Sequence, residues 1–348
     1  MIDHHPYVLV DLSISLPIRF WLFFFSFLLS IICCLIVLYH LLSDRVLRRT
    51  LNNHVIIVLL FNTLLYALTS IPLHLSYYYL GTVIPAVPNL CLIWMFLDGG
   101  IFTFALILVA WASIERYILI FHDKWMSTRK KRLFIHYLPL AAIFIYCFIF
   151  HAVTILFPPC VNIFQYNLPL CGRPLCYYEL RFVALWDTIT NNILPTLAII
   201  LFSIALLIRV LLQKHRMHQQ LQWKKHRKMT IQLLSISILY FFLYIPPMFV
   251  ELMQQCCVSE DFGADFQLEA QFFSYYVICF FPFISAMSLP KRKFEFRRLF
   301  SCWRGRTQIV GPETLVMGRL RQAQQNTMVF NRQTTVAIQK IDYRTKTN

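Results

Sequence analysis

The sequence predicts an all-α integral membrane protein: a bundle of seven transmembrane helices followed by a short amphipathic eighth helix. Hydrophobic residues make up 58% of the 348 residues, and the mean hydropathy is +0.60. A soluble domain is only about 45–50% apolar, so most of this chain is suited to lipid. Seven segments are long and apolar enough to cross a ~30 Å hydrocarbon core, which takes roughly 20 residues in a helix. The loops between these segments divide their basic residues very unevenly.

The distribution of basic residues predicts the orientation. Of the 32 Lys and Arg residues, the loops on one side hold only Arg19, Arg173 and Arg181, and the opposite loops and tail hold all the others. Cytosolic loops carry such an excess, so the N-terminus is expected outside the cell and the protein in the plasma membrane. The basic residues of these cytosolic loops and of the tail account for the formal net charge of +16. We therefore expect membrane lipid, and no nucleic acid, among its partners.

Composition divides the chain into three parts. Residues 1–18 are expected to form an extracellular tail, with no signal-peptide pattern. Residues 19–302 hold the predicted helices. Residues 303–348 are polar and rich in Gln, Arg and Thr, which favours a disordered cytoplasmic tail.

The first four spans follow from their apolar runs and the breaks between them. Pro72 is expected to kink the second span, because proline removes a helix hydrogen bond. The fourth begins after the basic residues 129–132 and ends before Pro158. The expected bounds are Arg19 to Leu42, Leu51 to Tyr79, Leu92 to Ser113 and Leu133 to Phe157.

The last three spans are separated by a long outer loop and a short basic inner loop. The outer loop, Cys160 to Trp186, has the Pro, Gly and Tyr content of irregular or hairpin structure. After the seventh span, Lys291 to Phe300 predicts the amphipathic helix, and Cys302 is placed for palmitoylation. The expected bounds of the spans are Val183 to Leu212, His226 to Gln254 and Gln267 to Leu289.

The third span carries the most informative pattern. Cys91 precedes Arg116 by 25 residues, a rise of about 38 Å at ~1.5 Å per residue, so the two mark opposite membrane surfaces. Asp98 lies seven residues after Cys91, about two turns deeper on the same face. Glu115, Arg116 and Tyr117 stand together at the inner end. One helix thus offers an outer thiol, a buried carboxylate and an inner Glu-Arg-Tyr motif.

This pattern resembles the third helix of the rhodopsin-like (class A) G-protein-coupled receptors, and the resemblance covers residues 19–302. The chain departs from the family at Asn62, where an aspartate is usual, and at Phe281, which replaces the asparagine before Pro282. The resemblance implies a receptor, without enzymatic activity or cofactor, that binds an extracellular ligand and activates a heterotrimeric G protein. Arrestin is a further implied partner, through the C-terminal tail.

The resemblance also gives the Glu-Arg-Tyr motif a role. In the family the carboxylate, here Glu115, holds the arginine in the resting state, and the arginine, here Arg116, then reaches the G protein. The family's second acidic clamp is missing, since residues 226–228 at the foot of the sixth span are basic. We therefore expect a less firmly held resting state. The alternative is that Arg116 is merely a positive-inside residue.

The family ties the top of the third helix to the long outer loop by a disulfide. Of the loop cysteines, Cys176 is nearest the fifth span and is the expected partner of Cys91, with Cys171 as the second choice.

Asp98 is the sharpest candidate for a ligand contact, because a carboxylate within a span is costly and by default functional. In the resembling family, receptors for amines and some peptides pair a ligand cation with an aspartate at this place, often supported by a tyrosine, here Tyr275. Tyr244 and Glu251, the latter part of an acidic outer rim that favours basic ligands, complete the expected ligand site. The alternative is that Asp98 is neutral, or bonded internally, in a pocket of another chemistry.

Two other classes of function remain to be weighed. A transporter of a cationic solute needs charges deep in several spans, and only Asp98 is plainly deep. A membrane enzyme needs a metal or nucleophile constellation, whereas His74 and His151 are expected to stand alone. We therefore predict no catalytic site and no metal site.

Overall fold

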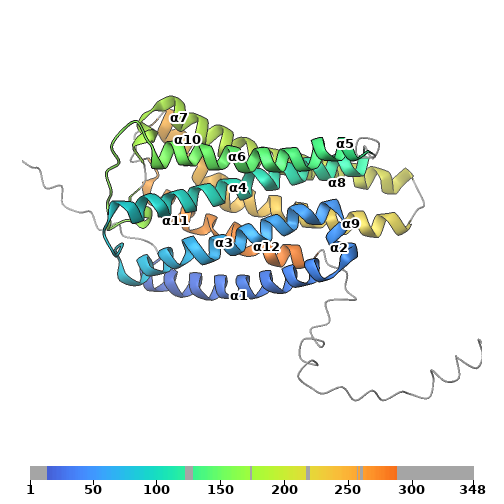
Figure 1. Ribbon diagram of the computed structural model, residues 1–348, viewed down its shortest axis with the longest axis horizontal. Coiled ribbons are helices and arrows are strands. Elements are labelled where there is room, and N and C mark those ends of the chain that lie inside the picture. The colour runs from blue at the N-terminus through green and yellow to red at the C-terminus, as the bar shows by residue number, and fades with distance from the viewer. Residues whose placement is uncertain are drawn as a thin grey trace, which may run out of the picture. The chain divides into compact units, whose positions relative to one another are not determined.

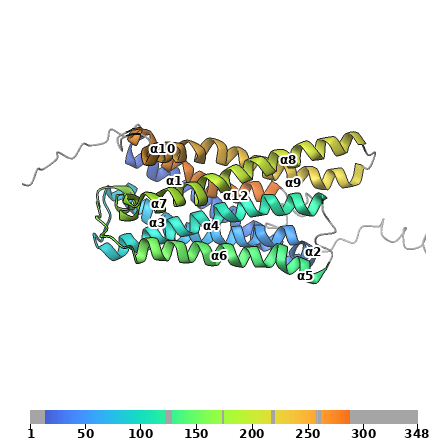
Figure 2. The same ribbon diagram turned by 90° about the horizontal axis from the view of Figure 1, so that it is seen from above.

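The computed structural model describes residues 14–121, 128–172, 175–216, 220–256, 258 and 262–287. Within these ranges every regular element is a helix, and seven helical spans are long and apolar enough to cross a membrane (Figure 1 and Figure 2). The predicted bundle of seven membrane helices is confirmed. The expected eighth helix, Lys291 to Phe300, and Cys302 lie outside the described residues.

Three spans are single α-helices and four are built from several helical segments. The first three are α1 (Leu16–Ser43), α3 (Leu51–Leu80) and α4 (Pro88–Phe121). The fourth is α5 (Arg129–Arg132), η2 (Leu133–Tyr137), α6 (Leu138–His151) and η3 (Ala152–Leu156), and the fifth is α7 (Arg181–Trp186), η6 (Asp187–Ile193) and α8 (Leu194–Arg216). The sixth is α9 (Gln220–Leu239), η7 (Tyr240–Tyr244) and α10 (Ile245–Cys256), and the seventh is α11 (Ala264–Ser274) and α12 (Tyr276–Met287). Short connecting helices are α2 (Arg45–Arg49), η4 (Pro169–Cys171) and η5 (Cys176–Glu179).

The apolar side chains divide between the core and the outside of the bundle. On α1, Phe23 and Phe27 are fully buried against the neighbouring spans, whereas Trp21, Phe25 and Leu29 are more than half exposed. In water such a surface would be costly, but a helix that is apolar all round is suited to lipid. The exposed aromatic and aliphatic residues are therefore the expected lipid-facing surface of a membrane bundle.

Four π-helical segments interrupt the described parts of the fourth, fifth and sixth spans. A π turn is wider than an α turn, changes which side chains face the bundle, and occurs frequently at functional sites. In η6 the buried side chains are Asp187, Thr188 and Asn191. In η7 they are Tyr240 and Tyr244. The wide turns of the fifth and sixth spans thus point polar side chains inward.

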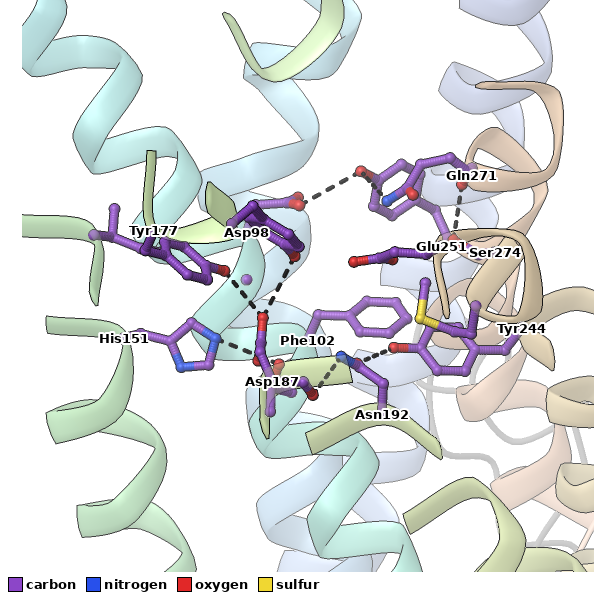
Figure 3. A pocket seen from close by; sticks show the side chains of 16 residues that line it. Asp98, Phe102, His151, Tyr177, Asp187, Asn192, Tyr244, Glu251, Gln271 and Ser274 are labelled. Carbon is purple, nitrogen blue, oxygen red and sulfur yellow. Dashed lines mark hydrogen bonds between the residues drawn. The ribbon is translucent and has the colours of Figure 1, made fainter. Parts of the chain in front are cut away.

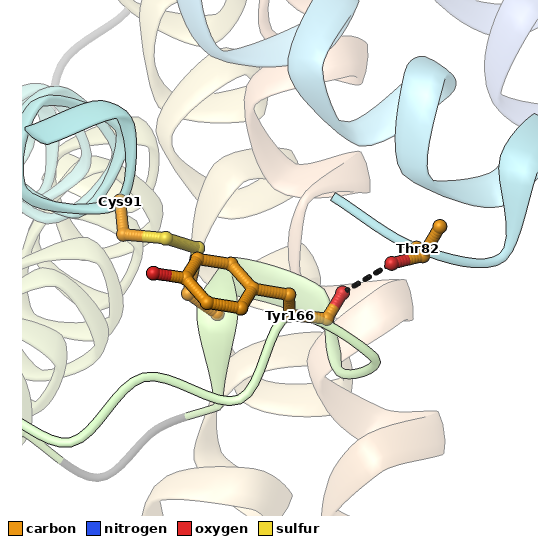
Figure 4. The surroundings of a disulfide bond; sticks show 4 residues. Thr82, Cys91 and Tyr166 are labelled. Atoms are coloured by element: carbon orange, nitrogen blue, oxygen red, sulfur yellow. Dashed lines mark hydrogen bonds between the residues drawn. A yellow bond between two sulfur atoms is a disulfide. The ribbon is translucent and has the colours of Figure 1, made fainter. Parts of the chain in front are cut away.

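The two disulfide bonds among the described residues lie at one end of the bundle, here called the disulfide end, and the opposite end is called the Glu115 end. Cys91 is bonded to Cys171, and Cys160 is bonded to Cys176. The expected Cys91–Cys176 pairing was wrong, and the second choice, Cys171, is the observed partner of Cys91 (Figure 4).

Local backbone geometry explains the observed pairing. Leu170, Cys171 and Gly172 all have positive φ, which turns the chain sharply, and the N–H of Gln165 donates to the carbonyl of Cys171 at 2.8 Å. Cys176 is already held by Cys160, and its backbone N–H donates to Asn162. Distance along the chain from the fifth span, on which the expectation rested, does not capture these turns.

The same loop is tied to the end of α3. The carbonyl of Tyr166 accepts a hydrogen bond from the hydroxyl of Thr82 at 3.0 Å (Figure 4). It accepts a second one from the N–H of Val83 at 2.8 Å. The hydroxyl of Tyr77 donates to the carbonyl of Asn167 at 3.1 Å. Disulfides and hydrogen bonds together hold the loop across the disulfide end, and no strand forms in its described residues.

Candidate functional site: a polar cavity and the Glu-Arg-Tyr motif

A cavity of about 50 Å³ lies between the third to seventh spans near the disulfide end (Figure 3). All four residues predicted for the ligand site line it: Asp98, Tyr244, Glu251 and Tyr275. The loop contributes Tyr177 and Tyr178 from η5. The four side chains that we expected in the ligand site therefore lie around one cavity.

Asp98 is 2% exposed and is held by hydroxyl groups. Its Oδ1 accepts hydrogen bonds from Tyr66 and Ser70 of α3, both at 2.7 Å. Its Oδ2 accepts a longer one, at 3.4 Å, from Tyr275 (Figure 3). These hydroxyl donors satisfy lone pairs of the carboxylate without adding any charge of their own. Asp98 is therefore bonded internally, which was the alternative given above, and it also lines the cavity.

His74 and His151 do not stand alone, contrary to expectation. The Nε2 of His74 lies 3.8 Å from Oδ1 of Asp98, and its ring packs against those of Trp94 and Tyr275. The Nε2 of His151 lies 3.4 Å from the hydroxyl of Thr103, within the cavity lining. Both histidines belong to the surroundings of the cavity. Among the described residues, no three His, Cys, Asp or Glu side chains are placed to hold a metal ion.

Asp187 is a cavity residue that the sequence reasoning missed. It is 5% exposed and lies in η6. Its Oδ2 accepts hydrogen bonds from the hydroxyls of Tyr177 at 3.0 Å and Tyr178 at 3.4 Å (Figure 3). Its Oδ1 accepts one from the amide of Asn191 at 2.8 Å. The available signal was an acidic residue inside the predicted fifth span, the same signal that pointed to Asp98.

The cavity lining is therefore acidic. It includes the carboxylates of Asp98, Asp187 and Glu251, and among the described residues no lysine or arginine lines it. Across the cavity, the hydroxyl of Tyr244 donates to the amide oxygen of Asn192, which joins the two π-helical segments of the fifth and sixth spans (Figure 3).

At the Glu115 end the motif residues are buried, but their contacts differ from the expectation. Glu115 is 1% exposed and bonds to Nδ1 of His136 in η2, at 2.5 Å. Nη1 of Arg116 donates to Oε1 of Gln232 in α9, at 3.4 Å. Within the described part of the chain, Glu115 and Arg116 form no ion pair. The expectation that Glu115 holds Arg116 was wrong for this structure, because the carboxylate of Glu115 is bonded to His136 instead.

Tyr117 faces the fifth span. Its ring packs edge-on against Phe202, and the guanidinium of Arg209 lies 5.1 Å from the ring centre. The motif thus contacts three different spans: Glu115 the fourth, Arg116 the sixth and Tyr117 the fifth. His136 and Gln232 were missed from the sequence because a histidine or glutamine in a span has no distinguishing pattern.

Comparison with known families decides what kind of protein this is. Residues 20–284 match the model of the seven-transmembrane receptor (rhodopsin family). The chain belongs to this family. The receptor is also similar in fold to squid rhodopsin, whose crystal structure aligns with a TM-score of 0.63 at 19% identity, over 83% of this chain and 86% of that one. None of the curated protein sequences matches the receptor.

Family membership makes the protein a G-protein-coupled receptor and a multi-pass membrane protein. Rhodopsin-family receptors have ligand and G-protein partners in general. At 19% identity, the likeness to squid rhodopsin describes the fold alone.

Proposed function

We propose that this receptor lies in the plasma membrane with its N-terminus outside, binds an extracellular amine or cationic peptide in the acidic cavity, and activates a heterotrimeric G protein. One observation carries the ligand class. Three carboxylates line a single cavity, and no lysine or arginine among the described residues lines it with them.

Electrostatics makes this lining favourable for a cation. Buried charges are costly unless they are paired, and the hydroxyl and amide donors around Asp98 and Asp187 are neutral. A ligand ammonium or guanidinium would be attracted by the three carboxylates and gain charge-assisted hydrogen bonds. A neutral ligand would gain no such attraction, and an anionic ligand would be repelled.

The size of the cavity limits what enters it. A water molecule needs roughly 10–15 Å³ measured in this way, so about 50 Å³ holds only a few waters. This space suits a cationic head group, such as an amine or one basic side chain of a peptide. Any larger remainder of the ligand would lie towards the loop that carries Tyr177 and Tyr178.

The orientation rests on the basic residues. The loops of the Glu115 end include the basic helices α2 and α5, as expected of a cytosolic face. The disulfide bonds at the opposite end are consistent with an oxidising exterior. In this orientation the cavity meets the outside and Arg116 meets the G protein.

The test uses the purified receptor in lipid nanodiscs with mixed heterotrimeric G proteins. Guanine-nucleotide exchange is measured with a panel of amines and basic peptides, each paired with a neutral analogue of the same shape. The proposal requires that cationic members stimulate exchange and their neutral analogues do not. Activation by neutral ligands alone would overturn the ligand class. Uptake of a labelled cation into vesicles without nucleotide exchange would instead identify a transporter.

A further inference from the structure

At the Glu115 end, three titratable side chains from three spans form a continuous chain of hydrogen bonds. The carboxylate of Glu115 bonds to Nδ1 of His136, and Nε2 of His136 lies 3.3 Å from Nδ1 of His54 in α3. Nε2 of His54 lies 2.8 Å from the backbone carbonyl of Arg48 in α2. His136 is fully buried, at 0% exposure, and His54 is partly buried. The chain thus runs from the motif to the first loop of the Glu115 end.

Counting hydrogens determines the charge of this chain. Each of the three bonds needs one hydrogen, and the carbonyl of Arg48 and an ionised Glu115 can only accept. Two neutral imidazole rings carry one N–H each and supply only two of the three. The complete chain therefore holds one additional proton, shared among Glu115, His136 and His54. With that proton its net charge is zero, so Glu115 is neutralised without help from Arg116.

This arrangement changes what restrains Arg116. With Glu115 bonded to His136, Arg116 contacts the sixth span through a hydrogen bond of 3.4 Å to the uncharged side chain of Gln232. This distance is longer than the usual ~2.7–3.2 Å of an N–H···O hydrogen bond, so the bond is weak. The tie between the third and sixth spans is thus a weak one.

We propose that the Glu115–His136–His54 chain sets the basal activity of the receptor: while His136 is bonded to Glu115, Glu115 is kept from Arg116 and the resting state is weakly restrained. Removal of His136 returns the carboxylate to the adjacent arginine and lowers basal activity. The inference rests on the proposed coupling to a G protein. It assigns His136 a positioning role, exerted through Glu115.

The other groups around the chain are mostly basic or neutral. The ring of Tyr137 contacts both histidines. Basic residues lie on the packed elements α2, α4 and α5: Arg45, Arg48, Arg116, Lys130, Lys131 and Arg132. Asp44 caps α2 through the N–H of Val46. These side chains surround the chain, but none of them makes one of its three hydrogen bonds.

The first experiment measures ligand-free nucleotide exchange in nanodiscs for two replacements of His136. His136→Phe keeps the ring but removes both hydrogen bonds, and basal exchange should fall about fivefold or more, the lower end of typical coupling between sites. His136→Gln keeps a donor for Glu115 and should retain most of the activity. His40→Phe, which removes a histidine from α1 at the same end, is the matched control and should change nothing.

A double variant separates this role of His136 from a purely structural one. In a Glu115→Gln background, His136→Phe should have less than about a twofold effect, since no carboxylate remains to capture Arg116. A rise or no change in basal exchange on His136→Phe, or an equal effect in the Glu115→Gln background, would overturn the proposal.

Two further measurements cover folding and coupling. If His136→Phe does not fold, His54→Leu breaks only the bond between the histidines and should lower basal exchange in the same direction, by a smaller factor. The distance between spin labels at the exposed positions Val46 and Ile231 measures the position of the sixth span in the absence of G protein. A shift of the label-to-label distance in His136→Phe towards its resting value supports the inference. If the receptor catalyses no nucleotide exchange at all, that result counts against the proposed function alone and leaves the distance measurement valid. An unchanged distance distribution would overturn the inference.

Discussion

The two ends of the bundle treat buried carboxylates in opposite ways. At the disulfide end, Asp98 and Asp187 accept hydrogen bonds from neutral hydroxyl and amide groups, and no described lysine or arginine lines their cavity. At the Glu115 end, Glu115 is bonded to His136 in a chain that carries its own balancing proton. The first arrangement gathers negative charge around a cavity, where we propose that a cationic ligand binds. The second removes the charge from Arg116.

This difference separates binding from transmission. A change in charge at the disulfide end should alter ligand affinity and leave basal exchange nearly constant. A change at the Glu115 end should alter exchange and leave affinity nearly constant. A variant at either end that changed both ligand affinity and basal exchange would show that the two ends are energetically coupled.

The largest expected effect is at Arg116. Arg116→Ala removes the guanidinium proposed to enter the G protein and should abolish stimulated nucleotide exchange, while surface expression and ligand affinity stay within about twofold. Exchange in nanodiscs and a binding isotherm on the same preparation check both halves. Equal nucleotide exchange in variant and parent would mean that Arg116 is merely a positive-inside residue.

Asp98→Asn should have the largest effect on affinity. The variant keeps the shape and the acceptor of Asp98 but removes its charge. Truncating one partner of a buried charge pair costs about 2–5 kcal/mol, so the Kd of a cationic agonist should rise at least roughly thirtyfold. The Kd of a neutral analogue of the same shape is the control and should barely move. An unchanged Kd for the cation would end the assignment of Asp98.

Asp187→Asn tests the second carboxylate of the cavity. Asparagine still accepts hydrogen bonds from Tyr177 and Tyr178, so the change isolates the charge. We expect the Kd of a cationic agonist to rise about tenfold, the size of one charge-assisted hydrogen bond. Thr188→Ala, which alters the next residue of η6, is the control for damage to the π-helical segment. Similar losses in the two variants would assign Asp187 a structural role.

The disulfide bonds should act on the disulfide end alone. The bond between Cys160 and Cys176 holds η5, which contributes Tyr177 and Tyr178 to the cavity. Replacing both cysteines with serine should raise the agonist Kd about fivefold through the lost order of the loop, and basal exchange should not change. Peptide mapping of the parent without reduction should recover the Cys91–Cys171 link. Recovery of a Cys91–Cys176 link would contradict the observed pairing.

The smallest effect is expected at Tyr275. Its hydroxyl lies 3.4 Å from Asp98, a long hydrogen bond. Tyr275→Phe should therefore raise the agonist Kd by only about two- to threefold, the low end of the range for one hydrogen bond. In an Asp98→Asn background the same change should have still less effect. Additive losses in the double variant would mean that Tyr275 contacts the ligand independently of Asp98.

Local pattern was enough to predict the fold and much of the cavity. The length of an apolar run determines whether a helix can cross the membrane, and the seven predicted spans are confirmed. The carboxylate within a span pointed to Asp98, the acidic rim to Glu251 and the family resemblance to Tyr244 and Tyr275, and all four line one cavity. Asp187 was predictable by the rule applied to Asp98 and was overlooked.

The tertiary structure alone decided which partners these residues have. Cys171 reaches Cys91 because Leu170 and Cys171 adopt positive φ, a feature with no signal in the run of cysteines. Glu115 meets His136 because the third and fourth spans pack side by side there, although arginine is its neighbour in sequence. Helical periodicity determines the direction of a side chain. A hydrogen bond or a disulfide also requires a separation of a few ångströms between residues far apart in the chain, and that depends on the packing of whole helices.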